Sequence, residues 1–407
     1  MKILIITTNG ITTTFKSWPE RLQARGLSQR GHQVRAITYR GKQDFNRLEH
    51  ETIDNVEVTR VKRRGWLSWE LVKALFKGPK PDVVHLHHLS NQLAFETAII
   101  CKLRRIPLVM TPHGLFHDPY LVKDRDRPFA TPARYSEMIL SLPQLVRALV
   151  KQFKPKRHLK NYLSHSPLLM MDRVIVLSRH GKEVALKLGV KEKRLAIVPN
   201  AIDQDWVESE GNTELPPEMR GFEGPLVLYL GQFKYRKGFD LLAKAIPAIL
   251  EKCPETRFVF AGHSPIHEAE LIKLAEDANA RDRLILLHSV SEGEKAALFR
   301  RAAQSGVYVL PTRYEGFGIP LIEAMSLGCP VVSTNIPVID ELIKDGENGL
   351  LFPLEDVTGL AEAVTRVLQD PELHAKLAEG GLKTVQNYFT PVILDQLETI
   401  YKEVSSK

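Results

Sequence analysis

The stretch EGFGIPLIE, from Glu315 to Glu323, decides how the surrounding chain folds. It follows an apolar run, Val307 to Leu310, which predicts a buried parallel strand. Gly316 and Gly318 predict a loop in which the backbone approaches a ligand closely, and Pro320 lies where a helix takes its first residue. The first amides of a helix have no internal hydrogen-bond partner. This order of strand, glycine loop and helix therefore predicts an anion site.

Two carboxylates bracket this predicted anion site. Glu315 directly precedes the loop, and Glu323 lies about one helical turn after it. A carboxylate repels a phosphate, but it accepts hydrogen bonds from hydroxyl groups. The pattern therefore indicates a ligand that carries both a phosphate and sugar hydroxyls.

The two glutamates around GFG, followed by EAMSLGCPVVST, closely resemble the signature of the family 4 retaining glycosyltransferases. The resemblance implies the GT-B fold, an α/β architecture in which two Rossmann-like parallel-sheet domains face a central cleft. It also implies that Glu315 holds hydroxyls of the donor sugar and that Glu323 holds the ribose. The segment between them, with Gly316, Phe317, Gly318 and Ile319, would bind the diphosphate and sugar of the donor.

A length of 407 residues predicts more than one domain. We expect an acceptor-binding domain over residues 1–205, a linker over 206–224, a nucleotide-sugar-binding domain over 225–388 and a helix over 389–407 that crosses back to the first domain. Three widely spaced cysteines indicate a reducing compartment and favour neither a metal site nor a disulfide framework. The start MKILIITTNG is typical of a first strand rather than a signal peptide, and no apolar run is long enough to span a membrane. These features favour a cytoplasmic protein.

The charge is distributed unevenly. Residues 1–200 contain 36 Lys and Arg against 16 Asp and Glu, whereas the remainder contains 20 against 32. Two basic segments with large apolar residues, 60–77 and 144–163, are typical of a helix that lies on an anionic membrane surface. The alternative is an ordinary surface helix with its apolar stripe toward the core. Nucleic acid is not expected as a partner, because no nucleic-acid-binding module accompanies the charge.

The first half alternates apolar runs with longer amphipathic segments, which predicts βαβ units and a parallel sheet. The segment Ser17 to Glu20 is typical of a helix start. Gly10 is the one glycine where the family usually has a two-glycine donor loop, and no dinucleotide fingerprint follows the first strand. The predicted strands are Ile3 to Thr7, Gln33 to Thr38, Val56 to Val61, Val83 to Leu86, Leu108 to Thr111, Val174 to Leu177 and Ala196 to Val198.

Histidines occur at two predicted strand ends. His85 and His87 in the run HLHH, with His88 beside them, share one face of a strand, so a metal site is an alternative there. No carboxylate or cysteine cluster lies near in the sequence, and the family is metal-independent, so we expect none. His113, in VMTPHGLF, matches the family histidine that contacts the donor sugar. The alternative for a lone strand-end histidine is a packing role.

The second domain opens with a predicted strand, a basic loop and a helix. Gly231 and Gly238 bracket that loop, and its cations suit a diphosphate. The resemblance makes Lys237 the diphosphate-binding lysine. It also reveals a departure, because Gln232 stands where the family has an arginine, and Arg236 is the candidate that compensates. The residue expected beside the nucleotide base is Val290.

The resemblance therefore implies a metal-independent, retaining glycosyltransferase with no cofactor. The donor would be a UDP-, GDP- or ADP-sugar and the acceptor a glycan or a lipid-linked glycan, at the cytoplasmic face of a membrane. His113, Lys237 and Glu315 are the expected catalytic residues. Two alternatives stay open: a non-catalytic sugar-nucleotide-binding subunit, which Gln232 favours, and a GT-B nucleotide-sugar epimerase or phosphorylase. The sequence identifies neither the donor base nor the sugar, the acceptor, the linkage or the oligomeric state.

Overall fold

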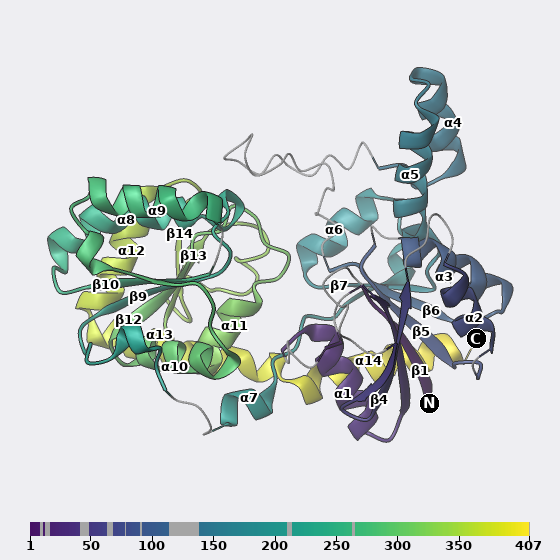
Figure 1. Ribbon diagram of the computed structural model, residues 1–407, viewed down its shortest axis with the longest axis horizontal. Coiled ribbons are helices and arrows are strands. Elements are labelled where there is room, and N and C mark those ends of the chain that lie inside the picture. The colour runs from purple at the N-terminus through teal and green to yellow at the C-terminus, as the bar shows by residue number, and fades with distance from the viewer. Residues whose placement is uncertain are drawn as a thin grey trace. The chain divides into compact units, whose positions relative to one another are not determined.

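The computed structural model describes residues 1–8, 11–12, 17–40, 49–62, 68–77, 79–89, 92–113, 138–209, 214–262 and 265–406. These residues form two compact units, each built on its own sheet (Figure 1). One unit contains the described residues from Met1 to Ile202 together with the segment from Thr390 onward, and the other runs from Asp203 to Phe389. The α/β class predicted from the sequence is confirmed, with sheets of eight and six strands.

The first unit contains an eight-stranded sheet in the order β3-β4-β2-β1-β5-β6-β7-β8. Every strand pair is parallel except β3 with β4. The central strands are apolar along their whole length because helices cover both faces of a parallel sheet. The strands are β1 (Lys2–Ile6), β2 (Gln33–Arg40), β3 (His50–Ile53), β4 (Val56–Lys62), β5 (Val83–His87), β6 (Leu108–Thr111), β7 (Arg173–Val176) and β8 (Leu195–Ile197).

All seven strands predicted for this half are confirmed within one or two residues at their ends. The edge strand β3 was not predicted, because its sequence HETI is largely polar. It forms an antiparallel hairpin with β4 through Asp54 and Asn55, whose φ angles of 51° and 61° suit a tight two-residue turn. The helices of this unit are α1 (Pro19–Gln29), α2 (Trp69–Lys77), α3 (Gln92–Leu103), α4 (Leu142–Lys151), α5 (Pro155–His165), α6 (Arg179–Lys187) and α14 (Thr390–Ser405).

The C-terminal helix α14 belongs to the first unit although almost two hundred residues separate it from the rest of that unit. Its buried face, with Ile393, Leu397 and Tyr401, joins the apolar core beneath β1 and β5. Gly26 of α1 allows the two helices to pack closely, because a Cβ there would lie 2.5 Å from Leu394 Cδ1. This packing places Tyr401 next to β5.

The second unit contains a six-stranded parallel sheet in the order β11-β10-β9-β12-β13-β14. Its strands are β9 (Leu226–Leu230), β10 (Arg257–Ala261), β11 (Leu284–Leu287), β12 (Gly306–Leu310), β13 (Val331–Thr334) and β14 (Leu350–Phe352). Its helices are α7 (Gln204–Glu208), α8 (Phe239–Lys252), α9 (Pro265–Asp277), α10 (Glu292–Ser305), α11 (Ile319–Ser326), α12 (Val357–Gln369) and α13 (Pro371–Val385).

In both sheets the strand order reverses at one pair of neighbouring strands, and we call this pair the change of direction in the sheet. The first sheet is built outward from β1 toward β4 and then from β5 toward β8, so the change lies between β1 and β5. In the second sheet the change lies between β9 and β12. Loops at the carboxyl ends of such a strand pair diverge and leave room for a ligand. None of the helices that the structure describes is long and apolar enough to cross a membrane.

Candidate active site

The second unit brings the two loops singled out from its sequence into contact. The loop after β9 carries Lys237, and the loop after β12 carries Glu315; the two strands are neighbours at the change of direction in the sheet. The loops are joined by backbone, since Arg313 N–H donates to the carbonyl of Arg236 at 2.9 Å. The hydroxyl of Thr312 donates to the same carbonyl at 3.0 Å. The strand order therefore places both sequence motifs at one site.

Lys237 and Glu315 form an ion pair within this site. Lys237 Nζ lies 2.5 Å from Glu315 Oε2, and the two side chains are only 17% and 12% exposed. The second carboxylate oxygen accepts the N–H of Gly316 at 3.0 Å. Burial alone would raise the pKa of Glu315, but Lys237 and this amide outweigh burial and lower it. Lys237 thus pairs with the carboxylate that also accepts the first amide of the glycine loop.

A second ion cluster, centred on Arg313, connects the two loops with helix α8. The guanidinium of Arg313, which is 3% exposed, donates to both oxygens of Asp240 at 2.7 and 2.9 Å and pairs with Glu355. It also donates to the carbonyl of Tyr235 at 2.5 Å. A guanidinium has a planar fork of donors, so one side chain fixes α8, the β9 loop and the β12 loop together.

Two glycines are required at the helix starts. Gly238 has φ +71°, and a Cβ at this position would lie 1.7 Å from the carbonyl oxygen of Pro311. Gly318 has φ +99° and is the N-cap of α11, so the predicted helix after EGFG is confirmed, with its first residue at Ile319, one position before Pro320. Both glycines adopt the left-handed conformation, which side chains disfavour. The backbone of each loop can therefore face a ligand without a side chain in between.

Glu323 lies in the interior of α11 and has a partner that the sequence did not suggest. Its Oε1 is 2.8 Å from Lys295 Nζ on α10, and the two side chains are 6% and 10% exposed. Lys295 also pairs with Glu292 at 2.8 Å and lies 4.7 Å above the ring of Trp206. Burial raises the pKa of Glu323, and Lys295 offsets this only in part. The carboxylate is held rigidly, with one oxygen committed to Lys295.

The remaining predicted donor residues are distributed around these loops. The side chain of Gln232 is exposed, and the backbone carbonyl of this residue accepts a hydrogen bond from the hydroxyl of Tyr229 at 2.8 Å. Val290 is half-buried directly before the N-cap of α10. Phe317 is 6% exposed, and its ring packs against that of Tyr388 with centroids 5.7 Å apart. Gly10 lies outside the described residues.

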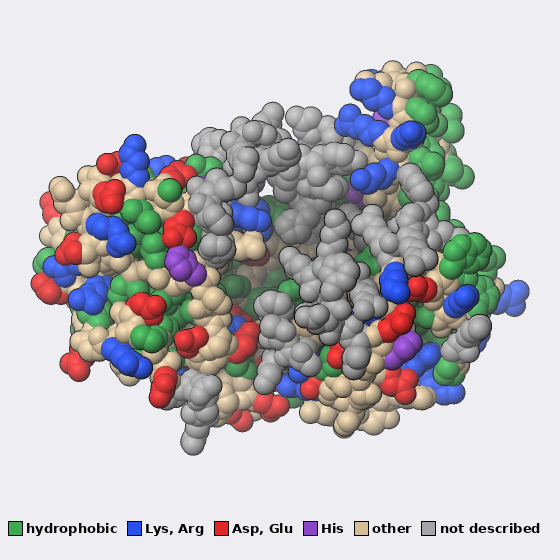
Figure 2. All heavy atoms as spheres, in the orientation of Figure 1, with side chains coloured by type: hydrophobic (Ala, Val, Ile, Leu, Met, Phe, Trp, Pro, Cys, Tyr) green, Lys and Arg blue, Asp and Glu red, His purple; other side chains and the backbone are tan. Residues whose placement is uncertain are grey.

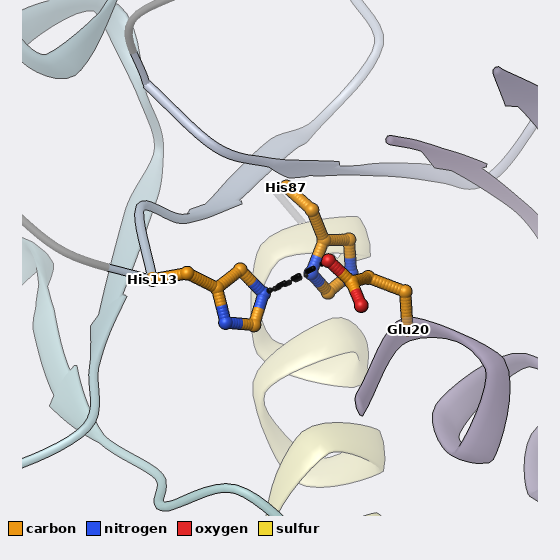
Figure 3. A group of neighbouring side chains, drawn as sticks. All are labelled: Glu20, His87 and His113. Atoms are coloured by element: carbon orange, nitrogen blue, oxygen red, sulfur yellow. Dashed lines mark hydrogen bonds and ion pairs between the residues drawn. The ribbon is translucent and has the colours of Figure 1, made fainter. Parts of the chain in front are cut away.

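A second group of polar side chains lies at the change of direction in the first sheet. His87 ends β5, His113 follows β6, and Glu20 lies in the first turn of α1 (Figure 3). His85 lies two residues before His87 in the same strand. His87 Nδ1 and His113 Nε2 are 2.7 Å apart and share one hydrogen bond. Glu20 Oε1 lies 2.8 Å from His88 Nε2 and 3.7 Å from His113 Nε2. The fold thus brings His113 together with residues from two other parts of the chain, the start of α1 and the end of β5.

Hydrogen bonds to α14 and to β6 anchor the histidine group, which consists of His85, His87, His88 and His113. His85 Nδ1 lies 2.6 Å from the hydroxyl of Tyr401 on α14, and its Nε2 lies 2.8 Å from Thr111 Oγ1. His88 and His113 have φ angles of +69° and +53°, a conformation that residues other than glycine seldom adopt. Such strained backbone clusters at functional sites, because the surrounding packing must enforce it. The neighbours of His113 thus hold its backbone in this conformation, and its role stays a prediction.

The electrostatics of this group favour the neutral form of its three buried imidazoles and the ionised form of Glu20. Burial lowers the pKa of His113 to about 4 and that of His85 to about 3, and it lowers the pKa of His87 well below its usual value. Burial raises the pKa of Glu20, but His113 and His88 outweigh burial and bring the pKa down to about 2. Near neutral pH, His113 therefore offers one N–H donor and one acceptor nitrogen.

Among the described residues, Glu20, His87 and His113 are the group that could hold a metal ion. One ligand atom from each lies within 4.8 Å of the others, and two imidazoles with a carboxylate form a known ligand set for transition metals. The carboxylate that the sequence did not place near HLHH is Glu20. The hydrogen bond between the two imidazoles would have to break for an ion to bind, so metal independence stays a prediction that requires a test.

Two family models match the chain along most of its length. The model of Glycosyltransferase Family 4 matches residues 21–206, and that of Glycosyl transferases group 1 matches residues 219–384. The first match contains His85, His87 and His113, and the second contains the ion pair of Lys237 and Glu315. The chain belongs to the family 4 glycosyltransferases. The family resemblance seen around the EGFG loop is therefore confirmed.

Individual relatives of this family 4 chain are similar over different lengths. It is 29% identical to the phosphatidyl-myo-inositol mannosyltransferase of Mycobacterium leprae over 51% of this chain and 54% of that protein. The chain thus spans about half the length of the mycobacterial relatives that it matches. It is 24% identical to the GDP-mannose:cellobiosyl-diphosphopolyprenol alpha-mannosyltransferase of Xanthomonas campestris over 78% of this chain and 72% of that protein.

A solved structure with the same fold is sucrose-phosphate synthase from Thermosynechococcus elongatus. It has a TM-score of 0.73 and 21% sequence identity and covers 100% of this chain and 99% of that chain. The family 4 chain therefore has the GT-B fold, as predicted from the sequence.

The sequence singled out candidate site residues in this family 4 chain but missed groups that contact two of them, Glu323 and His113. Lys295 lies 28 positions before Glu323, and Glu20 lies more than 60 positions before His87. The only sequence signal for Lys295 was its place in the helix EGEKAALFRRA. The sequence signal for Glu20 was its position in the first turn of the helix that follows the first strand. In a parallel sheet such a position lies near the carboxyl ends of the neighbouring strands.

Proposed function

We propose that this protein transfers a glycosyl group from a nucleoside-diphosphate sugar to a glycan or glycolipid acceptor, with retention at the anomeric carbon. The observation that carries the proposal is the ion pair of Lys237 and Glu315 beside the glycine loop that starts α11. A cation and the amides at a helix start suit a diphosphate, while the adjacent carboxylate suits sugar hydroxyls. Both chemistries belong to a nucleotide sugar.

The expected catalysis is electrostatic. As the glycosidic bond breaks, negative charge grows on the leaving diphosphate while the anomeric carbon becomes cation-like. Lys237 and the N–H groups of Gly316 to Gly318 would stabilise that negative charge without a metal ion, and Arg236 would add a second cation. Glu315 would orient the donor sugar and Glu323 the ribose. His113 keeps the role expected from its motif, a contact with the donor sugar.

The donor and acceptor are proposed from the relatives. Two of them are named as mannosyltransferases, one acting on phosphatidyl-myo-inositol and one on a diphosphopolyprenol-linked cellobiose. We propose a hexose donor with GDP-mannose as the first to test, and a lipid-linked acceptor at the cytoplasmic face of a membrane. The basic first half of the chain suits that location, because anionic lipids attract clusters of Lys and Arg.

A non-catalytic sugar-nucleotide-binding subunit is the alternative that one observation favours. Gln232, in place of the family arginine, is exposed and brings no charge to the diphosphate. If Arg236 does not compensate, the donor would bind weakly or without turnover. Binding and turnover must therefore be measured separately.

The test is thermal stability of the whole chain against UDP-, GDP- and ADP-sugars in the absence of added metal. A ligand that binds the folded state raises its stability by mass action. We expect a rise with one nucleotide class that is lost in Lys237→Ala and retained in Lys252→Ala, an exposed lysine at the end of α8. The same donor is then incubated with lipid extracts, and glycosyl transfer is followed by mass. Stabilisation without transfer to any acceptor would favour the non-catalytic subunit.

A further inference from the structure

Helices α4 and α5 form a hairpin whose outer helix has no buried residue. None of the ten side chains of α4 is buried within the described structure. Large apolar side chains at helical spacing follow one another along it and into the turn: Leu142, Val146, Val150 and Phe153 are 61%, 58%, 83% and 81% exposed. An amphipathic helix normally turns such a stripe toward the core. Here the stripe faces outward, in contrast to the ordinary surface helix that was the alternative for this segment.

The other side of the hairpin is strongly basic. Between residues 138 and 171 the chain contains six Lys and Arg and no Asp or Glu. In Figure 2 the apolar side chains gather along one edge of the hairpin and the cations along the opposite edge. This segregation of an apolar stripe from a cationic face is typical of helices that lie in the plane of an anionic bilayer.

A basic pocket lies between the two helices. Its volume is about 640 Å³, and its polar lining includes Arg147 and Lys151 from α4 with Arg157 and His158 from α5. The walls add apolar side chains, among them Ile139. Cations that converge from two helices on a pocket of this kind suit a phosphate, because each contributes a charge-assisted hydrogen bond. The pocket shares α4 with the exposed stripe, so one helix presents both features.

A second apolar patch lies on the same unit. Trp69 and Phe76 of α2 are 67% and 51% exposed, and Leu103 of α3 is 74% exposed. Arg104 lies over the ring of Phe76 at 5.4 Å. Helix α3 packs against α2 and also against α5, where Phe95 contacts Tyr162 with ring centroids 6.4 Å apart. Helix α3 therefore carries part of this patch and also contacts the hairpin.

We propose that the α4–α5 hairpin docks this protein onto a membrane that contains anionic phospholipids. The apolar stripe from Leu142 to Phe153 enters the boundary between headgroups and acyl chains, and the pocket around Arg147 and Lys151 receives a lipid phosphate. This inference deepens the proposed function, because a lipid-linked acceptor would be met at that surface, but vesicle binding requires neither the donor nor the acceptor.

Charge decides between a membrane and other partners for the stripe. A second copy of this chain would bring another acid-free, cationic hairpin against the first, and like charges would oppose that contact. Residues 114–137 of the same chain are the other candidate partner for the stripe. They carry equal numbers of Lys or Arg and of Asp or Glu, so they offer no net negative charge to the cationic side of the hairpin. An anionic bilayer supplies both an apolar phase for the stripe and phosphates for the pocket.

The experiment is co-sedimentation of the whole chain with vesicles, without nucleotide sugar. One set of vesicles contains phosphatidylcholine alone and the other contains phosphatidylglycerol as well. We expect binding to the anionic vesicles only, weakened by salt. Because each cation near an anionic surface contributes about a fivefold factor, Arg147→Ala with Lys151→Ala should weaken binding roughly thirtyfold. Val146→Ser with Val150→Ser should abolish most of the remaining binding, and both pairs are exposed enough to leave the fold intact.

Matched controls are Leu382→Ser and Lys252→Ala, an exposed leucine and an exposed lysine on the second unit, which should bind vesicles like the wild type. Equal binding to neutral vesicles, or binding unchanged in the hairpin variants, would overturn the proposal. So would stabilisation by inorganic phosphate without vesicle binding, or self-association that Val146→Ser with Val150→Ser abolishes. If no nucleotide sugar stabilises the protein but vesicle binding is normal, the proposed function is refuted and the proposed membrane-docking role of the hairpin is retained.

Discussion

Removal of Lys237 tests the site most directly, because the structure assigns this lysine two measurable effects. In the free protein it neutralises Glu315 at 2.5 Å, with both side chains largely withdrawn from water. In the donor complex it is expected to bind the diphosphate. The variant Lys237→Ala should therefore lose stability in the absence of donor and lose affinity for it in a separate measurement.

The magnitudes follow from the burial of the pair. Breaking a fully buried ion pair costs about 3–5 kcal/mol, and an exposed pair contributes about 0–1 kcal/mol. At 17% and 12% exposure the pair lies between these limits, so we expect Lys237→Ala to lose about 2 kcal/mol of unfolding free energy. Loss of one charge-assisted hydrogen bond to phosphate should weaken donor binding by about 1.5–3 kcal/mol, roughly 10- to 150-fold.

The assay is a double-mutant cycle with Lys237→Ala, Glu315→Ala and the double variant, measured by urea unfolding and by calorimetric titration of the donor. A coupling energy of about 1–2 kcal/mol is expected in the free protein, because each residue stabilises the other. Lys252→Ala controls for the change in net charge. The reasoning is refuted if Lys237→Ala behaves like Lys252→Ala in both measurements.

Three further predictions concern the loops and the histidine group. Gly238→Ala should lose more than about 2 kcal/mol of unfolding free energy, because its Cβ would lie 1.7 Å from the carbonyl oxygen of Pro311 at φ +71°; an unchanged urea midpoint would contradict this. Lowering the pH from about 6.5 to about 4 should reduce the free energy of unfolding by about 3 kcal/mol through His113. The pKa of His113 is about 4 in the folded protein, so the unfolded chain binds the proton at a higher pH than the folded chain does. In His113→Asn, urea unfolding should show a correspondingly flatter pH dependence. Addition of EDTA should leave glycosyl transfer unchanged; inactivation that zinc reverses would instead place a metal at Glu20, His87 and His113.

Predictions from the sequence succeeded where the determinants are local. The strand before EGFG, the helix after it and the apolar strands of the first sheet each depend on a few neighbouring residues. Strand β3 was missed because a polar edge strand lacks the apolar run that marks a buried one. The periodicity of α4 showed an apolar stripe, but periodicity cannot show what covers that stripe.

The sequence by itself determined the family and the α/β class, because both are encoded in short motifs and in the periodicity of apolar residues. It also singled out Lys237, Glu315 and Glu323, whose roles at the site stay predictions. Only the tertiary structure decided which groups face them. The strand order brings Lys237 to Glu315 across 78 positions, and helix packing brings Lys295 to Glu323. It likewise gathers Glu20, His87 and His113 from three separate strand and helix ends. Such partners come from chain topology, which depends on the packing of whole elements rather than on the residues adjacent in sequence.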